Sequence, residues 1–411
     1  MKNNSTFSDV IIIGGGASGL FCASLIKKHS PHLSVTILEK QKTVGKKLLA
    51  TGNGRCNLTN TNVSPDYYHG SFKSYCAEII KDFTPADLIS HLKSLGMLTT
   101  TDTEGRVYPL SRHSATMLDT LMLDCENSGV NIICDSFVNN IESNNNTYTV
   151  TTDNETYKCN KLVVATGSKA TPETGADDTI FKVINRMGIK TTHLTPALCP
   201  VYVRSKTLFA LKGVRACGKV SLIHNNKIIK TEDGEIQFTD KTLSGICIFN
   251  LSRLANTMDK SYISVSLLPF MDSTEIVELL CKAKQRLSPD TSAENILTGV
   301  FQRKLSAAIL KEVGINKDRT IATISRKEIN ELAQLINDWR FEVIPSSDFK
   351  RAQVVAGGID GAEINPTTME CKKHKNLYII GEAIDIDGDC GGFNLHFAFA
   401  SAYCAAKSIT I

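Results

Sequence analysis

Apolar residues along this chain gather into short runs that are separated by glycine turns and helical patterns. The first run covers 10–13 and precedes a glycine turn and a helix with small residues on one face, and the second ends at Glu39. A third run leads into 165–167, and a fourth leads into 381–382 ahead of an alanine-rich apolar helix. Continuous apolar runs of this length are typical of parallel strands buried on both faces. The pattern therefore predicts an α/β fold.

The segments between these runs have other periodicities. Amphipathic patterns predict helices over 74–83, 85–96 and 114–129. Gly129 stands where the C-terminal cap of the last of these helices belongs. An alternating pattern over 130–159, with an asparagine-rich turn at 144–146, predicts an antiparallel meander before the third run.

The pattern changes beyond about residue 193. Short strands are predicted over 198–205, 215–238 and 261–270, with a turn at Asn225-Asn226, and they indicate a β-barrel or sandwich-like domain. Amphipathic helices, most simply a small bundle, are predicted over 273–287, 294–314 and 326–339, and strands return over 339–355.

This order of elements predicts a discontinuous first domain with two inserted parts. The first domain takes 1–192 and 350–411. A β-rich substrate domain takes 193–270 with 339–349, and a helical cap domain takes 271–338.

The first glycine turn has the spacing Gly14-x-Gly16-x-x-Gly19. In a strand-turn-helix unit, Gly14 permits the tight turn, Gly16 lets the backbone approach a pyrophosphate, and Gly19 lets helix and strand pack closely. Glu39 follows twenty residues after Gly19, where a carboxylate hydrogen-bonds an adenosine ribose. Together these features predict a dinucleotide site, and the alternative is a glycine turn that holds no ligand.

The stretch "GKKLLATGNGRCNLTN", 45–60, follows Glu39 where a plain nicotinamide dehydrogenase would begin another strand and helix. It lacks apolar periodicity and combines glycines and amides with Lys46, Lys47 and Arg55. Backbone N–H groups and positive charge suit a loop that wraps a pyrophosphate and a ribityl chain, which favours FAD over NAD. The alternative is a solvated basic loop.

Composition narrows the class of protein. The 411 residues include 46 basic and 42 acidic ones, which are spread along the chain. A nucleic-acid backbone requires a concentrated positive potential, which this distribution does not provide, so nucleic acid is not an expected partner. Thirteen scattered cysteines without CxxC spacing argue against a disulfide framework and a zinc site, and favour a reducing cytoplasm with no metal. The apolar runs are too short for a signal peptide, membrane anchor or membrane span.

Several motifs together resemble the bacterial HI0933-like, or BaiN-type, flavoprotein family over almost the whole chain: "LLATGNGRCNLTN", "GRVYPLS", "VVAGGI", "INPTTME" and "GEAIDIDGDCGGFNLHFAFASAY". The ATG at 165–167 and the GE at 381–382 also resemble FAD domains of the glutathione-reductase and fumarate-reductase type. The resemblance implies a discontinuous Rossmann-like FAD-binding domain with an inserted β-barrel-like domain and a small helical domain. It also implies that the GE acid meets the ribityl hydroxyls and that the last helix points its N-terminus at the flavin pyrimidine.

The resemblance implies an activity as well. The best described branch of the family is linked to reduction of the Δ4 and Δ6 double bonds of 3-oxo bile acids with NAD(P)H, whereas the common label of aminoacetone oxidase implies little. In the family an aromatic residue after Gly391-Gly392 is usually tyrosine and the last helix is usually tryptophan-rich. This chain has Phe393 and "HFAF" over 396–399 instead, beside the expected flavin.

Motifs and resemblance together predict the residues that contact a non-covalent FAD: Gly14, Gly16, Ala17, Ser18, Gly19, Glu39, Lys40, Lys46, Lys47, Gly54, Arg55, Cys56, Asn57, Val138, Ala165, Thr166, Gly167, Gly381, Glu382, Asp387, Gly392, Asn394 and Leu395.

Three residues are candidates for the chemistry. Tyr108 is a candidate proton donor after hydride reaches the β-carbon of an enone, or else a packed aromatic beside Pro109. His396 is a catalytic candidate or a core histidine, and Arg55 is expected to reach the flavin ring. Cys56 and Cys390 form a redox pair or are ordinary buried thiols.

The expected function is an FAD-dependent reductase of activated C=C bonds in a 3-oxo-Δ4/Δ6 steroid or bile-acid-like enone. No second GxGxxG follows a mid-chain strand, so NAD(P)H is expected as a transient reductant without a Rossmann domain of its own. The expected partners are thus a small hydrophobic substrate and a pyridine nucleotide. The alternatives are an oxidase of a small amine, and an RNA-modifying or non-catalytic flavoprotein.

Overall fold

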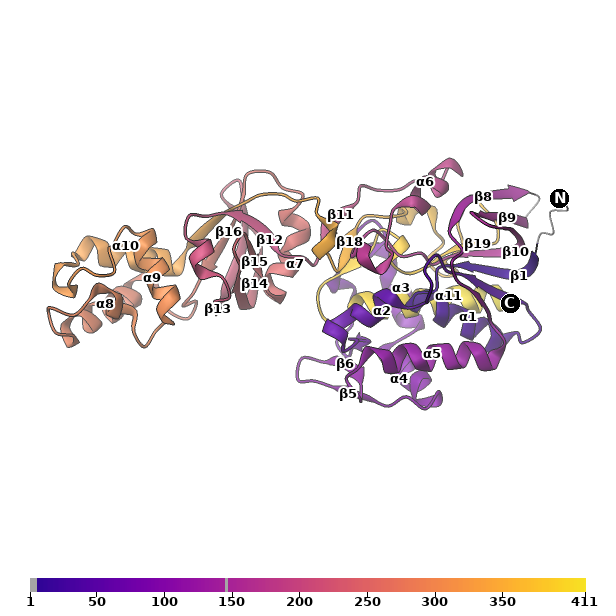
Figure 1. The fold of residues 1–411 in the computed structure, drawn as a ribbon, viewed down its shortest axis with the longest axis horizontal. Coiled ribbons are helices and arrows are strands. Elements are labelled where there is room, and N and C mark those ends of the chain that lie inside the picture. The colour runs from indigo at the N-terminus through magenta and orange to yellow at the C-terminus, as the bar shows by residue number, and fades with distance from the viewer. Residues whose placement is uncertain (1–5, 145–146) are drawn as a thin grey trace. The chain divides into compact units, whose positions relative to one another are not determined.

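A computed structural model describes residues 6–144 and 147–411, and Figure 1 shows the course of the chain. The predicted turn at 144–146 therefore lies, except for Asn144, outside the described residues, as do the first five residues of the N-terminus. The chain divides into two compact units: residues up to Pro196 together with Asp348–Ile411 form unit 1, and Ala197–Ser347 form unit 2. The finer division into three domains stays a prediction.

Unit 1 is built on a seven-stranded sheet with the order β7-β2-β1-β10-β9-β8, and β19 pairs with the end of β10. The four apolar runs lie in β1, β2, β10 and β19, which pair in parallel. The antiparallel meander predicted over 130–159 is present in β8, β9 and β10 but is wrong for its first strand, β7, which pairs parallel with β2. The strands are β1 (Thr6–Ile13), β2 (Val35–Leu38), β7 (Asn131–Ile133), β8 (Val138–Asn144), β9 (Thr147–Thr152), β10 (Thr156–Val164) and β19 (Leu377–Ile379).

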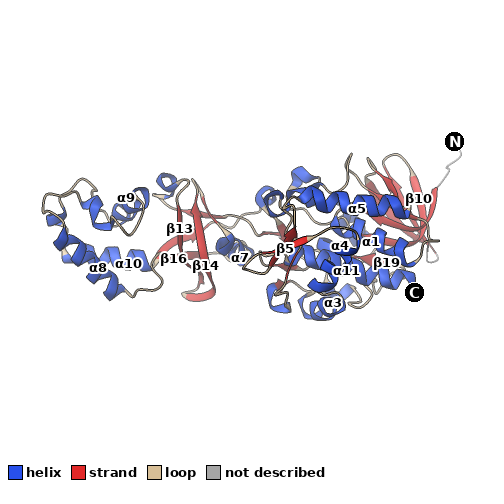
Figure 2. Ribbon diagram, turned by 90° about the horizontal axis from the view of Figure 1, so that it is seen from below, coloured by secondary structure: helices blue, strands red, loops and turns tan. Residues whose placement is uncertain are grey.

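Helix α1 packs against β2 of this sheet and against helices α5 and α11, which Figure 2 shows beside it. Gly129 caps α5 in the left-handed conformation, with a φ of 75°, as the sequence predicted. The helices are α1 (Ala17–His29), α3 (Cys76–Asp82), α4 (Pro85–Ser94), α5 (Ser114–Ser128), α6 (Thr179–Arg186) and α11 (Phe393–Thr410).

Short elements complete unit 1. The polar stretch after Glu39 contains one helix, α2 (Lys46–Ala50), which was not predicted because five residues are too few to show a helical period. The short strands are β3 (Thr59–Asn60), β4 (Tyr68–His69), β5 (Thr99–Thr101), β6 (Arg106–Pro109), β11 (Thr195–Ala197), β18 (Val354–Ala356) and β20 (Asp387–Gly388).

Unit 2 contains a closed barrel with the strand order β12-β15-β14-β13-β16-β17. The predicted turn joins β13 to β14, and Asn225 and Asn226 take positive φ values of 49° and 58° that suit a tight hairpin. Helix α7 (Ile246–Ala255) packs against β14. The strands are β12 (Val201–Arg204), β13 (Arg215–His224), β14 (Lys227–Phe238), β15 (Thr242–Ser244), β16 (Ser261–Ser266) and β17 (Trp339–Val343).

The helical part of unit 2 shares one hydrophobic core with the barrel, in which Trp339 of the barrel and Leu332 of a helix are both buried. Its helices are α8 (Ser273–Arg286), α9 (Arg303–Glu312) and α10 (Arg326–Asn337). The single helix predicted over 294–314 is wrong in part. A 3-10 turn, Ala293–Leu297, ends before Gly299, whose φ of 92° does not continue a right-handed helix, and α9 begins only at Arg303.

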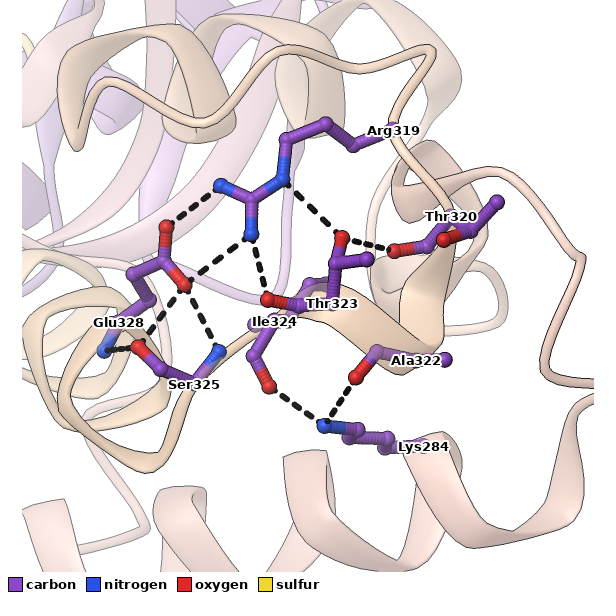
Figure 3. A network of polar contacts seen from close by, with 8 residues as sticks. All are labelled: Lys284, Arg319, Thr320, Ala322, Thr323, Ile324, Ser325 and Glu328. Atoms are coloured by element: carbon purple, nitrogen blue, oxygen red, sulfur yellow. Dashed lines mark hydrogen bonds and ion pairs between the residues drawn. The ribbon is translucent and has the colours of Figure 1, made fainter.

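A polar network fixes the segment between α9 and α10 (Figure 3). Arg319 donates to the Glu328 carboxylate at 2.7 Å and to the Thr323 carbonyl at 2.6 Å. Glu328 also completes the N-terminal cap of α10 by accepting from the Ser325 backbone at 2.7 Å. Lys284 of α8 donates to the carbonyls of Ala322 and Ile324. The segment is therefore held at several points along its length.

Candidate cofactor site

The register of the parallel strands places their carboxyl ends level with one another. Ile13 at the end of β1 pairs with Leu38 of β2 and with Val164 of β10, which in turn pairs with Ile379 of β19. The residues that follow these strands therefore meet along one edge of the sheet. Ligands of open α/β sheets bind at this edge.

In the glycine turn, the protein itself requires glycine at two of the three positions, and the third faces open space. Gly14 has a φ of 106°, and a Cβ there would lie 2.5 Å from the Ala165 carbonyl oxygen. A Cβ on Gly19 would lie 2.0 Å from the Gly14 carbonyl oxygen, whereas a Cβ on Gly16 would meet nothing within 4 Å. Gly16 also begins α1 without a side-chain cap. Open space in front of free helix N–H groups is the arrangement that binds a phosphate.

Glu39 stands beside this turn. Its carboxylate accepts hydrogen bonds from the backbone N–H groups of Gly15 and Gln41, each at 2.8 Å. Lys40 forms an ion pair with Asp177, and Lys46 donates to the Gln41 side chain at 2.7 Å. The two backbone donors therefore fix the Glu39 carboxylate at the carboxyl end of β2.

An ion pair between Lys47 and Glu382 links two segments of this site that are far apart in the sequence. Lys47 Nζ lies 2.5 Å from Glu382 Oε2, although the residues are 335 positions apart. Glu382 Oε1 accepts from the Ser168 hydroxyl at 2.6 Å and from the Val355 backbone at 3.1 Å. A carboxylate with these donors is held in one orientation.

A cavity of about 1470 Å³, including the part open to solvent, runs along this edge within unit 1. Most of the residues predicted to bind a cofactor line it: Gly14, Gly16, Ala17, Ser18, Glu39, Lys40, Lys46, Lys47, Val138, Ala165, Thr166, Gly167, Glu382, Asn394 and Leu395.

Other predicted residues lie outside the cavity lining: Gly19, Gly54, Arg55, Cys56, Asn57, Tyr108, Gly381, Asp387, Gly392 and His396. Some of them meet around the start of α11. A Cβ on Gly392 would lie 2.6 Å from Asn57 Oδ1, and Asn60 donates to the Gly391 carbonyl at 3.0 Å. The end of the polar stretch is thus held against the N-terminus of the last helix.

The three candidate catalytic residues, Arg55, Tyr108 and His396, lie in different surroundings. The Arg55 guanidinium lies 5.6 Å from the centre of the Tyr108 ring, and Tyr108 is 7% exposed. His396 is fully buried, with Nδ1 2.9 Å from the Thr59 hydroxyl. Burial lowers the pKa of His396 to about 4, so the ring is neutral at pH 7. Burial also raises the pKa of the Cys56 thiol to about 12, which leaves it protonated.

Sequence reasoning missed several residues of this region. Tyr68 lines the cavity and donates to the Phe393 carbonyl at 2.9 Å, and Ser168, Gln41 and Asp177 line it as well. Tyr68 belongs to a two-residue strand, which is too short to give a periodic signal. Gln41 and Ser168 directly follow motifs that were noticed, so their positions after Glu39 and Gly167 were the available signal.

Two further observations bear on the class of protein. No cluster of metal-ligating side chains occurs among the residues that the structure describes. Within the same residues, no helix has both the length and the apolar character needed to cross a membrane.

Comparisons with known proteins agree with this geometry. The family model of the HI0933-like protein Rossmann domain matches residues 8–408. A 3-dehydro-bile acid delta(4,6)-reductase of Clostridium scindens is 29% identical, over 97% of this chain and 98% of that protein. A ribosomal RNA dihydrouridine synthase of Haemophilus influenzae is 29% identical, over 99% of both.

Among solved structures, the 3-ketosteroid delta1-dehydrogenase from Sterolibacterium denitrificans is similar with a TM-score of 0.51 and 11% identity, over 99% of this chain and 100% of that one. At this identity the likeness concerns the fold alone. The predicted fold class, a Rossmann-like FAD domain with an inserted barrel and helices, is confirmed.

Proposed function

Because this chain belongs to the HI0933-like family of FAD-dependent oxidoreductases, we propose that it reduces a C=C bond conjugated to a carbonyl group. The observation that carries the proposal is a chemical one. The names of two relatives that span nearly the whole chain describe different substrates but the same bond change, because a Δ4,6-reductase and a dihydrouridine synthase both saturate such a bond. The proposed reductant is NAD(P)H.

The residues of the cavity fit a non-covalent FAD. The open space at Gly16 and the uncapped start of α1 are the proposed site of the diphosphate, and Glu39 is the proposed partner of the ribose. Lys47 and Glu382 form an ion pair, and the oriented Glu382 carboxylate is the proposed acceptor for the ribityl hydroxyls. Reduced FAD supplies the hydride of the reaction.

The protein must then deliver a proton. When hydride reaches the carbon β to the carbonyl, the α-carbon takes a proton, and the Tyr108 hydroxyl is the proposed donor. Arg55 lies over the Tyr108 ring, and its proposed role is to offset the negative charge that develops on the enolate oxygen. His396 is enclosed and neutral, so we assign it a positioning role through Thr59.

The proposed substrate is a small hydrophobic enone of the 3-oxo steroid or bile acid type, in line with the bile acid reductase. A second candidate is a uridine base within RNA, since the dihydrouridine synthase matches this chain over an equal share of its length. Both substrates present the same conjugated bond, so the residues described above serve either one.

The test follows flavin absorbance without oxygen. The purified protein is reduced with NADH or NADPH, then mixed with a 3-oxo-Δ4 steroid or with a uridine-containing oligoribonucleotide. We expect one of these substrates to reoxidise the flavin and to gain two hydrogen atoms by mass. The proposal is wrong if neither substrate reoxidises the flavin. If the protein also consumes oxygen and releases peroxide when a small amine is added, it is instead an amine oxidase.

A matched pair of variants tests the proton donor. Tyr108→Phe should slow reoxidation by substrate and leave reduction by NAD(P)H unchanged, because only the former step takes the proton. Tyr262→Phe removes a hydroxyl from a barrel strand in unit 2 and serves as the control. Equal reoxidation rates in both variants would exclude Tyr108 as the donor.

A further inference from the structure

An unpaired carboxamide stands in the wall of the cavity of unit 1. Gln353 lines this cavity and comes directly before β18. The residue is exposed, and its side chain makes no hydrogen bond among the residues that the structure describes. A carboxamide has two N–H donors and one carbonyl acceptor. In a binding cavity, such a group is available to a ligand.

Hydrogen bonds on both sides fix the backbone around Gln353. The Ala352 carbonyl accepts from the Thr171 hydroxyl at 2.8 Å, and the Val355 N–H donates to Glu382 Oε1 at 3.1 Å. Residues of an extended strand rise about 3.3 Å each, so Gln353 lies within about 7 Å of the residue that Glu382 holds. The side chain therefore starts from a defined point on the cavity wall, close to Glu382.

The same wall lies beside the start of the last helix. Strand β18 packs next to β20. In β20, the backbone N–H and carbonyl of Gly388 both bond to the side chain of Asn394, each at 2.8 Å, and Asn394 belongs to the first turn of α11. Glu382 is the proposed partner of the ribityl chain, and the N-terminus of α11 is expected at the flavin pyrimidine. Gln353 therefore belongs to the part of the cavity where the flavin ring is expected.

Most polar side chains in this part of the cavity are engaged within the protein. Their hydrogen bonds hold neighbouring segments of the wall together, as the bonds of Glu382 to Lys47 and Ser168 do. Gln353 differs from them because its side chain supports no other segment and can turn towards a ligand. The lining residues whose side chains have a hydrogen-bond partner here are Lys47, Thr51, Tyr68, Ser168, Glu382 and Asn394.

Apolar side chains surround this carboxamide in the cavity lining. Leu48, Val354, Ile386 and Phe397 line the cavity and are buried. One unpaired polar group among apolar side chains fits a hydrophobic ligand that carries one polar group at its reacting end. The first ring of a 3-oxo steroid has this form. A uracil base has two carbonyl groups and an N–H, and would leave several of them without a partner.

We infer that Gln353 binds the 3-oxo group of a steroid-type enone by donating a hydrogen bond to its carbonyl oxygen, an assignment that rests on the proposed reaction. When hydride adds to the β-carbon, the electron pair of the C=C bond moves towards this oxygen, and it returns when the α-carbon takes its proton. A donor already in place stabilises the negative charge that the oxygen carries between these two events. Gln353 is thus a substrate-binding residue, and Tyr108 remains the proposed proton donor.

The test titrates the oxidised holoprotein with a 3-oxo-Δ4 steroid and with the 3-deoxy steroid of the same skeleton, and follows the flavin absorbance spectrum. The unsubstituted protein should prefer the 3-oxo compound by roughly threefold to tenfold, the range of one neutral hydrogen bond. Gln353→Leu should abolish this preference, and so should Gln353→Glu, which keeps the size of the side chain but loses its N–H donors. The matched control is Gln334→Leu, which replaces an exposed glutamine of α10 outside the cavity.

Loss of the preference in both Gln353 variants, but not in Gln334→Leu, supports this role. An unchanged preference in Gln353→Leu overturns it, and so does the absence of steroid binding by the unsubstituted protein. The FAD affinity and the reduction potential of the ligand-free protein should be the same in Gln353→Leu as in Gln334→Leu, because a difference would show that Gln353 contacts the flavin instead. Slower flavin reduction by NAD(P)H in Gln353→Leu would assign the carboxamide to the nicotinamide and also overturn this role. If no steroid binds but the uridine-containing oligoribonucleotide reoxidises the flavin, Gln353 loses this role while the proposed reaction stands.

Discussion

Glu39 allows the proposed FAD site to be tested with a defined magnitude. In the structure its two carboxylate oxygens accept from the N–H groups of Gly15 and Gln41, each at 2.8 Å. Those bonds exist with or without a cofactor, whereas a bond to the adenosine ribose exists only in the complex. Glu39→Ala therefore has two separable effects: it loosens the turn in the apoprotein and removes one contact from the holoprotein.

The ribose contact sets the expected loss of affinity. A hydrogen bond to a charged group contributes roughly 1.5–3 kcal/mol. At about 1.4 kcal/mol for each factor of ten, FAD should bind between about tenfold and 150-fold more weakly to Glu39→Ala. The loss of the bonds to Gly15 and Gln41 should appear separately, as a lower free energy of unfolding of the apoprotein.

The assay is a titration of the apoprotein with FAD, followed by flavin fluorescence, together with urea unfolding of the same apoprotein. Glu126→Ala is the control, since it removes an exposed acid of α5 outside the cavity. An affinity for FAD equal to that of the unsubstituted protein would show that Glu39 supports the turn and does not meet the ribose.

Three other results are expected. Gly16→Ala should fold normally, because the added Cβ meets nothing within 4 Å, but should bind FAD at least roughly tenfold more weakly; near-normal FAD affinity would exclude a diphosphate from that space. Arg55→Ala should make the bound flavin harder to reduce, whereas Lys46→Ala should chiefly weaken FAD binding. The measurement is the reduction potential of the flavin in both variants, by dye-coupled reduction at saturating FAD. An unchanged potential in Arg55→Ala would show that Arg55 does not lie near the flavin ring. The Arg319 hydrogen bond lowers the pKa of Glu328 from 4.5 to about 2, so its stabilisation is complete above pH 4.5 and is lost as pH falls towards 2. Glu328→Gln should therefore lower the free energy of unfolding by roughly 1 kcal/mol at pH 7 and by almost nothing near pH 2, measured by urea titration; a difference independent of pH would contradict this.

The elements that could be predicted depend on neighbours close in sequence. The run at 10–13 forms the end of β1, Gly129 caps α5, and the Asn225-Asn226 turn closes a hairpin. Elements with weak local signals were missed or misjudged. Helix α2 has only five residues. The helix predicted over 294–314 is interrupted at Gly299, because the amphipathic pattern of the sequence continues there although the backbone leaves the helical conformation.

The sequence by itself determined the local chemistry of the site: a glycine turn at a strand end, an acid at the end of the next strand, and a polar stretch rich in cations. Such features follow from spacing along one or two elements, because backbone conformation and side-chain period act over a few residues. Only the tertiary structure decided which distant side chains meet. Lys47 reaches Glu382 because β1, β10 and β19 are level at one sheet edge, and Arg55 lies over Tyr108 although fifty-three positions separate them.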